Sequence, residues 1–265
     1  MIDKVINGRY RVYSFIANGS ITDIYLAIDT LFKRKVVVKF LKKNDQSSIY
    51  HLINESNIVS KINNDSVVKI YELGVFEKRF YNVLEFIEGV TIRKIIGTKK
   101  KFLEKCKILL KICEAIIFIH EKGIIHRDIK PDNIYYLNNK EIKINDFGIS
   151  SDIMNKNKND LKLLGSVYYL SPENVHFGII NISNDIYALG ILAYELFYNK
   201  LPSFKKTDSI INIVDEINDK IDFNSDDSIP KEISDILRKA TKKNYRERYN
   251  SVSEMKNDLE NFLKK

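Results

Sequence analysis

The sequence predicts an α+β protein of two lobes: a small N-terminal lobe built on an antiparallel sheet with one helix, and a larger, mainly helical C-terminal lobe. In the first third of the chain, apolar and polar residues alternate over short runs, whereas apolar residues recur at helical spacing after about Thr91. The chain has 265 residues, 44% of them hydrophobic. That is enough to bury a core divided between two lobes.

The N-terminal runs are rich in Val, Ile, Tyr and Phe and are separated by turn-forming residues, as is typical of an antiparallel sheet. One helix is expected among them, over about residues 47 to 62, with Ser47 or Ser48 as its N-cap. The expected strands are RYRVYSFIA (9–17), TDIYLAID (22–29), KRKVVVKFL (33–41), SVVKIYELG (66–74) and RFYNVLEFI (79–87).

The C-terminal region shows long amphipathic patterns that predict helices. Between the first two of them, the β-like runs NIYYL and EIKIN are joined by the turn NNK and predict a hairpin. The predicted helices cover 103–122, 184–199, 208–218, 231–241 and 252–264.

The composition argues against several classes of protein. No apolar run reaches the roughly 18 residues of a membrane span, and the N-terminus lacks the apolar core of a signal peptide. The net charge is +8, but the lysines are scattered and no aromatic residues are interleaved with arginines, so we expect no nucleic-acid binding. Cys106 and Cys113 lie about two helical turns apart, too far for a disulfide, and are expected to be reduced. A cytoplasmic protein is the expectation.

The stretch HRDIKPDN, residues 126 to 133, concentrates charge between two apolar runs. Asp128 and Asn133 lie in it, Lys130 lies between them, and Asp146 follows the predicted hairpin in INDFGIS. If the hairpin strands fold back on each other, Asp146 returns beside Asn133. Two of the three oxygen-bearing side chains would then suit Mg²⁺, and one would remain free as a base.

The N-terminal lobe offers the phosphate side of such a site. The run IANGSITDIYLA places Gly19 in a turn between two strands, where backbone N–H groups can cover phosphates. The run VVVK ends in Lys39, and Glu55 on the following helix is positioned to pair with it. Each signal is weak alone, but their joint occurrence in this order is a strong indication.

These motifs resemble a eukaryotic-type Ser/Thr protein kinase domain, and most closely the bacterial branch of that family. HRDIKPDN, DFG and SPE (residues 171–173) match its catalytic-loop, metal-binding and activation-segment motifs in order. The resemblance runs from about Tyr10 to the last helix. It implies one kinase domain over 1–265, with an N-lobe of about 1–87 and a C-lobe of about 88–265.

The resemblance also implies the roles of residues in phosphoryl transfer from ATP to Ser or Thr hydroxyls of protein substrates. Asp128 would act as the catalytic base, and Lys130 would steady the γ-phosphoryl group. Asn133 and Asp146 would hold Mg²⁺, with Mn²⁺ as an alternative. Lys39, positioned by Glu55, would hold the α- and β-phosphates.

By the same resemblance, Leu84 is the gatekeeper, and the backbone of Glu85 and Ile87 bonds the adenine edge. The implied ATP-binding residues are Ile16, Ala17, Asn18, Gly19, Ser20, Ile24, Val37, Lys39, Leu84, Glu85, Ile87 and Tyr135.

The chain departs from the family in its nucleotide site. Ala17 and Thr22 replace two glycines of the phosphate loop, so the loop should be stiffer. Val37 and Tyr135 are larger than the usual residues above and below adenine. A narrower nucleotide slot with weaker ATP binding is therefore expected.

The segment from Asp146 to Glu173 contains no threonine. Ser150 and Ser151 are its candidate phosphorylation sites, since Ser166 is expected to bond near Asp128 and Lys130. Our hypothesis is that activation depends little on phosphorylation here, with Asp152 or Asp160 facing Arg127 instead.

The resemblance implies structural roles for three features. His126 could be a general base or a metal ligand, but in this motif we expect it to pack and hydrogen-bond behind Phe147. Glu173 and Arg248 are expected to form a buried ion pair, and Asp185 is expected to anchor the catalytic loop.

Two alternative functions are open: a pseudokinase scaffold that binds nucleotide weakly, and a kinase of small molecules. Because the chain ends after its last helix, without the membrane span of the kinases it resembles, we expect a free cytosolic kinase. The resemblance leaves homodimerisation through the N-lobe open.

Overall fold

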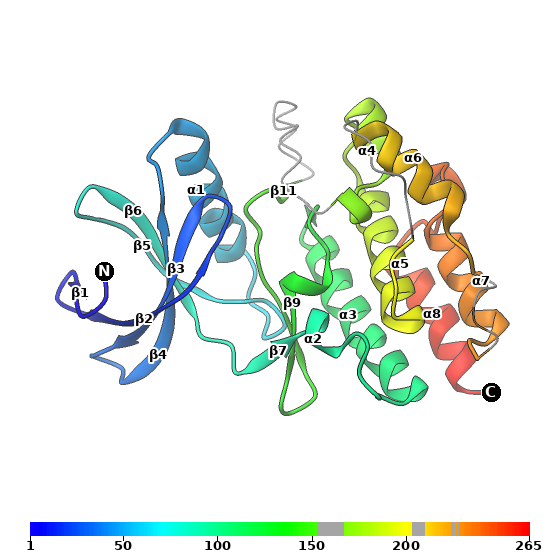
Figure 1. Ribbon diagram of the computed structural model, residues 1–265, viewed down its shortest axis with the longest axis horizontal. Helices are drawn as coiled ribbons and strands as arrows, with labels where there is room; N and C mark the ends of the chain where they lie inside the picture. The colour runs from blue at the N-terminus through cyan, green and yellow to red at the C-terminus, as the bar shows by residue number, and fades with distance from the viewer. Residues whose placement is uncertain (153–166, 203–209, 224–225, 227) are drawn as a thin grey trace. The chain divides into compact units, whose positions relative to one another are not determined.

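The computed structural model describes residues 1–152, 167–202, 210–223, 226 and 228–265 (Figure 1). The chain divides into two compact units. The first contains Met1–Glu88 and Asp146–Ile149, and the second contains Gly89–Asn145 and Ser150–Lys265. The first unit is built on an antiparallel sheet and the second is mainly helical, so the predicted α+β class is confirmed. The DFG residues belong to the first unit, although they lie far along the sequence.

The sheet of the first unit has the strand order β1-β2-β3-β4-β6-β5, with every neighbouring pair antiparallel. Alternate residues of its strands face opposite sides. Val36, Val38 and Phe40 of β4 join a buried apolar cluster on one side, which leaves Val37 and Lys39 facing the other. The strands are β1 (Val5–Ile6), β2 (Tyr10–Asn18), β3 (Thr22–Asp29), β4 (Arg34–Leu41), β5 (Ile70–Phe76) and β6 (Arg79–Glu85).

Helix α1 (Gln46–Ser60) begins one residue after its N-cap, Asp45. The prediction of Ser47 or Ser48 as the cap was wrong. The Asp45 carboxylate accepts the backbone N–H of Ser48 at 2.9 Å and the Ser48 hydroxyl at 2.8 Å. Ser48 therefore lies in the first turn as the partner of the cap.

The second unit is organised around α5. Every residue of this helix from Ser183 to Tyr198 is buried, as expected of a helix that is apolar on most sides. The five long helices are found within two residues of their predicted bounds. The helices are α2 (Ile92–Ile95), α3 (Phe102–Glu121), α4 (Pro172–Phe177), α5 (Ile182–Tyr198), α6 (Ile210–Lys220), α7 (Lys231–Ala240) and α8 (Val252–Leu263).

Short strands complete the second unit. The predicted hairpin is confirmed, because β9 (Ile134–Leu137) and β10 (Ile142–Ile144) pair with Ile134 opposite Ile144. β7 (Gly89–Thr91) pairs with β9, and β8 (Ile124–Ile125) pairs with β11 (Ser151–Asp152).

Within the described ranges, no helix is long and apolar enough to cross a membrane. Cys106 and Cys113 are buried and free of disulfides, and burial raises the pKa of each thiol to about 12.

Candidate active site

Lys39 and Glu55 form a buried ion pair in the first unit. Lys39 Nζ lies 2.8 Å from Glu55 Oε1, and only 10% and 5% of the two side chains are exposed. Strand β4 supplies the lysine and α1 supplies the glutamate. The pairing expected from the sequence is therefore present. Asn82 of β6, which the sequence analysis did not single out, donates its Nδ2 to Glu55 Oε2 at 3.1 Å.

The sheet register collects five of the predicted nucleotide residues on the face that carries Lys39. Lys39 lies opposite Ile24 on one side and Asn82 on the other, and Ile24 lies opposite Ala17. Cross-strand partners face the same side of a sheet. One row of side chains therefore runs from Ala17 to Asn82.

A second row lies one pleat away on the same face. It contains Leu26, Val37 and Leu84, with Val37 directly between the other two. Leu84 is 1% exposed. Val37 and the predicted gatekeeper therefore lie side by side, two residues along their strands from the row of Lys39.

The turn between β2 and β3 carries the predicted phosphate-loop residues Asn18, Gly19 and Ser20. The N–H of Gly19 donates to the carbonyl of Thr22 at 2.8 Å. A Cβ at Gly19 would lie 2.9 Å from Thr22 Oγ1 and 3.2 Å from its carbonyl oxygen, so the tight turn favours glycine at this position. Lys42 Nζ donates to the Gly19 carbonyl at 2.6 Å, which adds positive charge beside the turn.

The predicted hinge begins where β6 ends at Glu85, with Ile87 two residues further on. The N–H of Glu85 donates to the carbonyl of Lys69 at 2.8 Å. A backbone contact of Glu85 with adenine would therefore have to use its carbonyl oxygen. Ile16 lies on β2, next to Ala17 in sequence, and is 48% exposed.

The DFG residues lie with α1 in the first unit. Asp146 has a φ of 69°, a left-handed conformation that aspartate tolerates better than most residues. Phe147 is fully buried. Gly148 offers its carbonyl to His51 Nδ1 at 3.0 Å. Because a carbonyl only accepts, the Nδ1 of His51 carries the proton.

His51 is a second residue that sequence reasoning missed. It lies one helical turn before Glu55 and is 4% exposed, and the two therefore share one side of α1. The sequence feature that could have pointed to His51 is its position four residues before Glu55. Nothing in the sequence, however, showed that Gly148 would lie against it.

The catalytic loop of the second unit brings Asp128, Lys130 and Asn133 together. Lys130 Nζ lies 2.8 Å and 2.6 Å from the two carboxylate oxygens of Asp128. Asn133 Nδ2 donates to the Asp128 backbone carbonyl at 2.9 Å and to its Oδ2 at 2.8 Å. These bonds fix the orientation of the amide, so Asn133 Oδ1 is the atom that can coordinate a cation.

Asp185 anchors this loop, as expected. It is fully buried and accepts the backbone N–H groups of His126 and Arg127, each at 2.8 Å, while His120 Nε2 lies 2.9 Å away. Burial alone would raise the pKa of Asp185, but the His120 hydrogen bond, the nearby histidines and the Arg127 N–H outweigh it and lower this pKa. Arg127 has a φ of 69°, so the anchor holds a strained backbone.

His126 has a structural role here. Its Nδ1 accepts the backbone N–H of Asp128 at 3.2 Å, so its Nε2 carries the proton and donates to the Asn145 carbonyl at 3.2 Å. The ring is fully buried. It thereby ties the catalytic loop to the chain just before the DFG residues.

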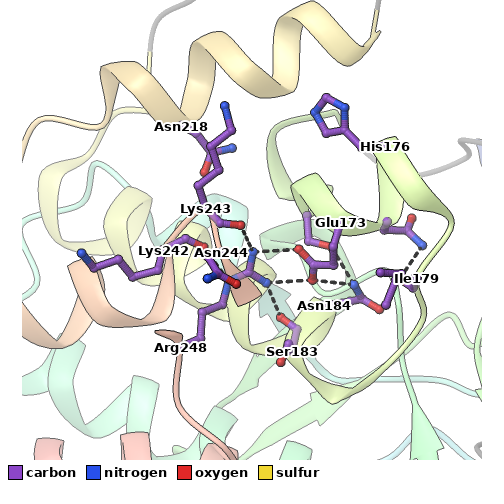
Figure 2. A network of polar contacts seen from close by, with 12 residues as sticks. Glu173, His176, Ile179, Ser183, Asn184, Asn218, Lys242, Lys243, Asn244 and Arg248 are labelled. Carbon is purple, nitrogen blue, oxygen red and sulfur yellow. Dashed lines mark hydrogen bonds and ion pairs between the residues drawn. The ribbon is translucent and has the colours of Figure 1, made fainter. Parts of the chain in front are cut away.

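Figure 2 shows the predicted pair of Glu173 and Arg248, which is present and buried. Two bonds of 2.8 Å join the guanidinium to the carboxylate. Arg248 also donates to the Ser183 carbonyl at 2.9 Å, and Asn184 Nδ2 donates to Glu173 at 2.8 Å. The network connects α4, the start of α5 and the segment before α8.

Arg93 of α2 forms another network that the sequence analysis missed. Its guanidinium donates to Asp132 of the catalytic loop and to Glu195 of α5. It also lies 3.1 Å from the hydroxyl of Tyr169, which itself donates to Glu195. The segment before Ser171 is thereby joined to the catalytic loop.

Comparison with known proteins identifies the family. The family model described as "Protein kinase domain" matches residues 10–259. The chain belongs to the protein kinase family. It is 32% identical to serine/threonine-protein kinase PrkC of Bacillus subtilis, over 98% of this chain and 41% of that protein.

Other bacterial kinases are similar over nearly the whole chain. Probable serine/threonine-protein kinase PknB of Lactococcus lactis is 30% identical over 97% of this chain and 42% of its own length. PknB of Mycobacterium tuberculosis is 28% identical over 96% and 43%. The chain thus spans about two fifths of the curated relatives it matches. The family recognised from the motifs is confirmed.

Protein kinases use ATP and a divalent metal ion, typically Mg²⁺. No group of three or more His, Cys, Asp or Glu side chains in the described part of this kinase could hold a metal. Asn133, in the second unit, and Asp146, in the first, are nevertheless residue types that suit Mg²⁺, which takes one or two protein oxygens and completes its coordination with phosphates and water. The fixed orientation of the Asn133 amide supports this fit.

The structure describes Ser150, one of the candidate phosphorylation sites between Asp146 and Glu173. Ser150 is 4% exposed, and its hydroxyl donates to the His126 carbonyl at 2.8 Å. Phosphorylation of Ser150 would require this contact to break. The predictions for the side chains of Ser151 and Asp152, and those for Asp160 and Ser166, lie outside the described residues.

Proposed function

We propose that this kinase domain transfers the γ-phosphate of ATP to Ser or Thr hydroxyls of protein substrates. The arrangement of Asp128, Lys130 and Asn133 carries the proposal. A base, a cation and an oriented amide oxygen converge within one short loop, and each is held by hydrogen bonds of 2.9 Å or less.

Each residue then has a defined task. Asp128 accepts the proton of the substrate hydroxyl and orients it toward the phosphorus. Lys130, already beside that carboxylate, stabilises the charge on the transferring phosphoryl group. Lys39, paired with Glu55, binds the α- and β-phosphates. Asn133 and Asp146 would hold Mg²⁺ or Mn²⁺, which neutralises phosphate charge when bound.

ATP is proposed to bind against the face of the first sheet that carries Lys39. The turn of Asn18, Gly19 and Ser20 would cover the phosphates with backbone N–H groups other than that of Gly19, which donates to the Thr22 carbonyl. The adenine would meet an apolar surface and the hinge backbone. The proposed ATP-binding residues are Ile16, Ala17, Asn18, Gly19, Ser20, Ile24, Val37, Lys39, Leu84, Glu85, Ile87 and Tyr135.

The names of the relatives favour a serine/threonine protein kinase over a pseudokinase or a small-molecule kinase. Cytoplasmic location, homodimerisation through the N-lobe, and the narrowing of the slot by Val37 and Tyr135 stay predictions from the sequence.

The proposal is tested with γ-labelled ATP, Mg²⁺ and a generic protein substrate. We expect the protein to transfer label and Asp128→Asn to transfer at least about 10²-fold more slowly, since a general base contributes that much. ATP should raise the melting temperature of both proteins equally. No transfer by the wild-type protein, with no thermal shift, would contradict the proposal, and so would equal transfer by the variant.

A further inference from the structure

Asn82 is a polar side chain in the middle of the buried part of β6. It is completely buried, as are the adjacent Tyr81 and Val83. Those two neighbours belong to the apolar cluster on one face of the sheet, so Asn82 faces the other side. An amide buried without hydrogen bonds is unfavourable. The hydrogen-bond partners of the Asn82 side chain therefore indicate its role.

Among the described residues, the side chain of Asn82 makes one hydrogen bond. Its Nδ2 donates to Glu55 Oε2 at 3.1 Å, whereas its Oδ1 is buried with no partner in the described part of the chain. The reverse orientation would place the amide oxygen against a carboxylate oxygen, and both groups only accept. The chemistry therefore fixes the amide with its nitrogen toward Glu55.

This bond completes the coordination of the Glu55 carboxylate. Oε1 receives Lys39 Nζ at 2.8 Å, and Oε2 receives Asn82. Lys39 and Asn82 are direct cross-strand partners, so the two donors approach from adjacent strands. A carboxylate held at both oxygens cannot turn about its terminal bond without breaking one of these contacts.

We propose that Asn82 is a positioning residue that keeps Glu55 aimed at Lys39. It acts through the glutamate, and the inference rests on the proposed function for the role of Lys39 toward ATP. The Lys39–Glu55 pair is then preformed in the nucleotide-free protein, because the third member of the network comes from the sheet itself. Preformed geometry lowers the cost of binding and orienting the phosphates.

The variant Asn82→Leu removes the donor but keeps a side chain of similar size that suits a buried strand. We expect kcat/KM for ATP to fall about tenfold, as for loss of one hydrogen bond to a charged group. The melting temperature should stay unchanged or rise. The matched control is Val83→Ala, on the same strand but the opposite face. It should lower the melting temperature while keeping kcat/KM at a temperature where it is folded.

A double-mutant cycle on the nucleotide-free protein tests the route through Glu55 without any activity measurement. Asn82→Leu should raise the melting temperature more in a Glu55→Ala background than in the wild type, because no carboxylate oxygen is then left without its donor. Equal shifts in both backgrounds, or wild-type kcat/KM in Asn82→Leu, would overturn the inference. Failure of the wild-type protein to transfer phosphate would overturn the proposed function instead, since the melting cycle uses no ATP.

Discussion

Asp128, Lys130 and Asn133 were all identified from one short motif, because their spacing within a single loop brings them together. The Lys39–Glu55 pair was also expected, since both lie at defined places on adjacent elements. His51, Asn82 and Arg93 could not be found in this way. Each acts through a partner far away in sequence, such as Gly148, Glu55 or Tyr169, and no local pattern reveals such a contact.

His51 provides a prediction at the same scale. Its Nδ1–H is bonded to the Gly148 carbonyl, two residues beyond Asp146, so His51 should help to hold the segment that carries Asp146, the aspartate proposed to bind the metal. His51→Leu removes the donor, and we expect kcat to fall by up to about tenfold, the equivalent of one neutral hydrogen bond. His51→Asn keeps an N–H donor near the position of Nδ1 and should retain most of the activity. Steady-state kcat at saturating ATP measures both.

Equal impairment of the two His51 variants would show that ring packing matters and the hydrogen bond does not. Wild-type activity in His51→Leu would show that His51 does not help to hold the segment that carries Asp146.

Among the elements, α4 is held by the buried ion pair of Glu173 with Arg248, and loss of this pair should lower the free energy of unfolding. Arg248 is 0% exposed and Glu173 is 2% exposed at the side chain. Glu173→Ala would leave the guanidinium buried without its carboxylate, and we expect a loss of about 3–5 kcal/mol in the free energy of unfolding. Urea unfolding of the whole protein, monitored by circular dichroism, measures this loss.

The matched control is Glu260→Ala on α8, which breaks a more exposed pair with Lys256 of 2.9 Å. It should change the free energy of unfolding by less than about 1 kcal/mol. Similar losses for Glu173→Ala and Glu260→Ala would contradict the importance given to burial.

A pH-sensitive contact joins Arg9, the residue just before β2, to Asp29, the last residue of β3. Arg9 donates two hydrogen bonds to Asp29, at 3.0 Å and 2.7 Å. These bonds outweigh the opposing effect of burial, and with the backbone N–H groups of Phe32 and Leu31 they lower the pKa of Asp29 to about 2. The ordinary value is about 3.9, so the unfolded chain binds the proton more readily. The stability that Asp29 contributes should therefore be complete above about pH 4 and be lost toward pH 2.

This dependence is measured by urea unfolding at several pH values for the wild-type protein and Asp29→Asn. The variant should have a lower free energy of unfolding than the wild-type protein at pH 7. The difference between the two should disappear as the pH falls from about 4 to 2. A difference that stays constant down to pH 2 would contradict the prediction.

For the whole molecule, periodicity predicted the long helices, the main strands and the division into two units of different class. It missed β1, β7, β8, β11, α2 and α4, which span too few residues to show a period. It also could not show that Asp146–Ile149 joins the first unit, because this depends on contacts of distant segments such as that of His51 with Gly148. Local patterns determined the elements, and tertiary contacts determined how the site is supported.

The most direct test of the account is phosphate transfer from ATP to three matched peptides that carry Ser, Thr or Tyr as the only hydroxyl. The proposed function, supported by the names of the relatives, predicts labelling of the Ser and Thr peptides by the wild-type protein and little or none on Tyr. With Asp128 as the base, it also predicts at least about a 10²-fold loss in Asp128→Asn. Labelling of Tyr as readily as Ser, or transfer by the variant at the wild-type rate, would contradict it.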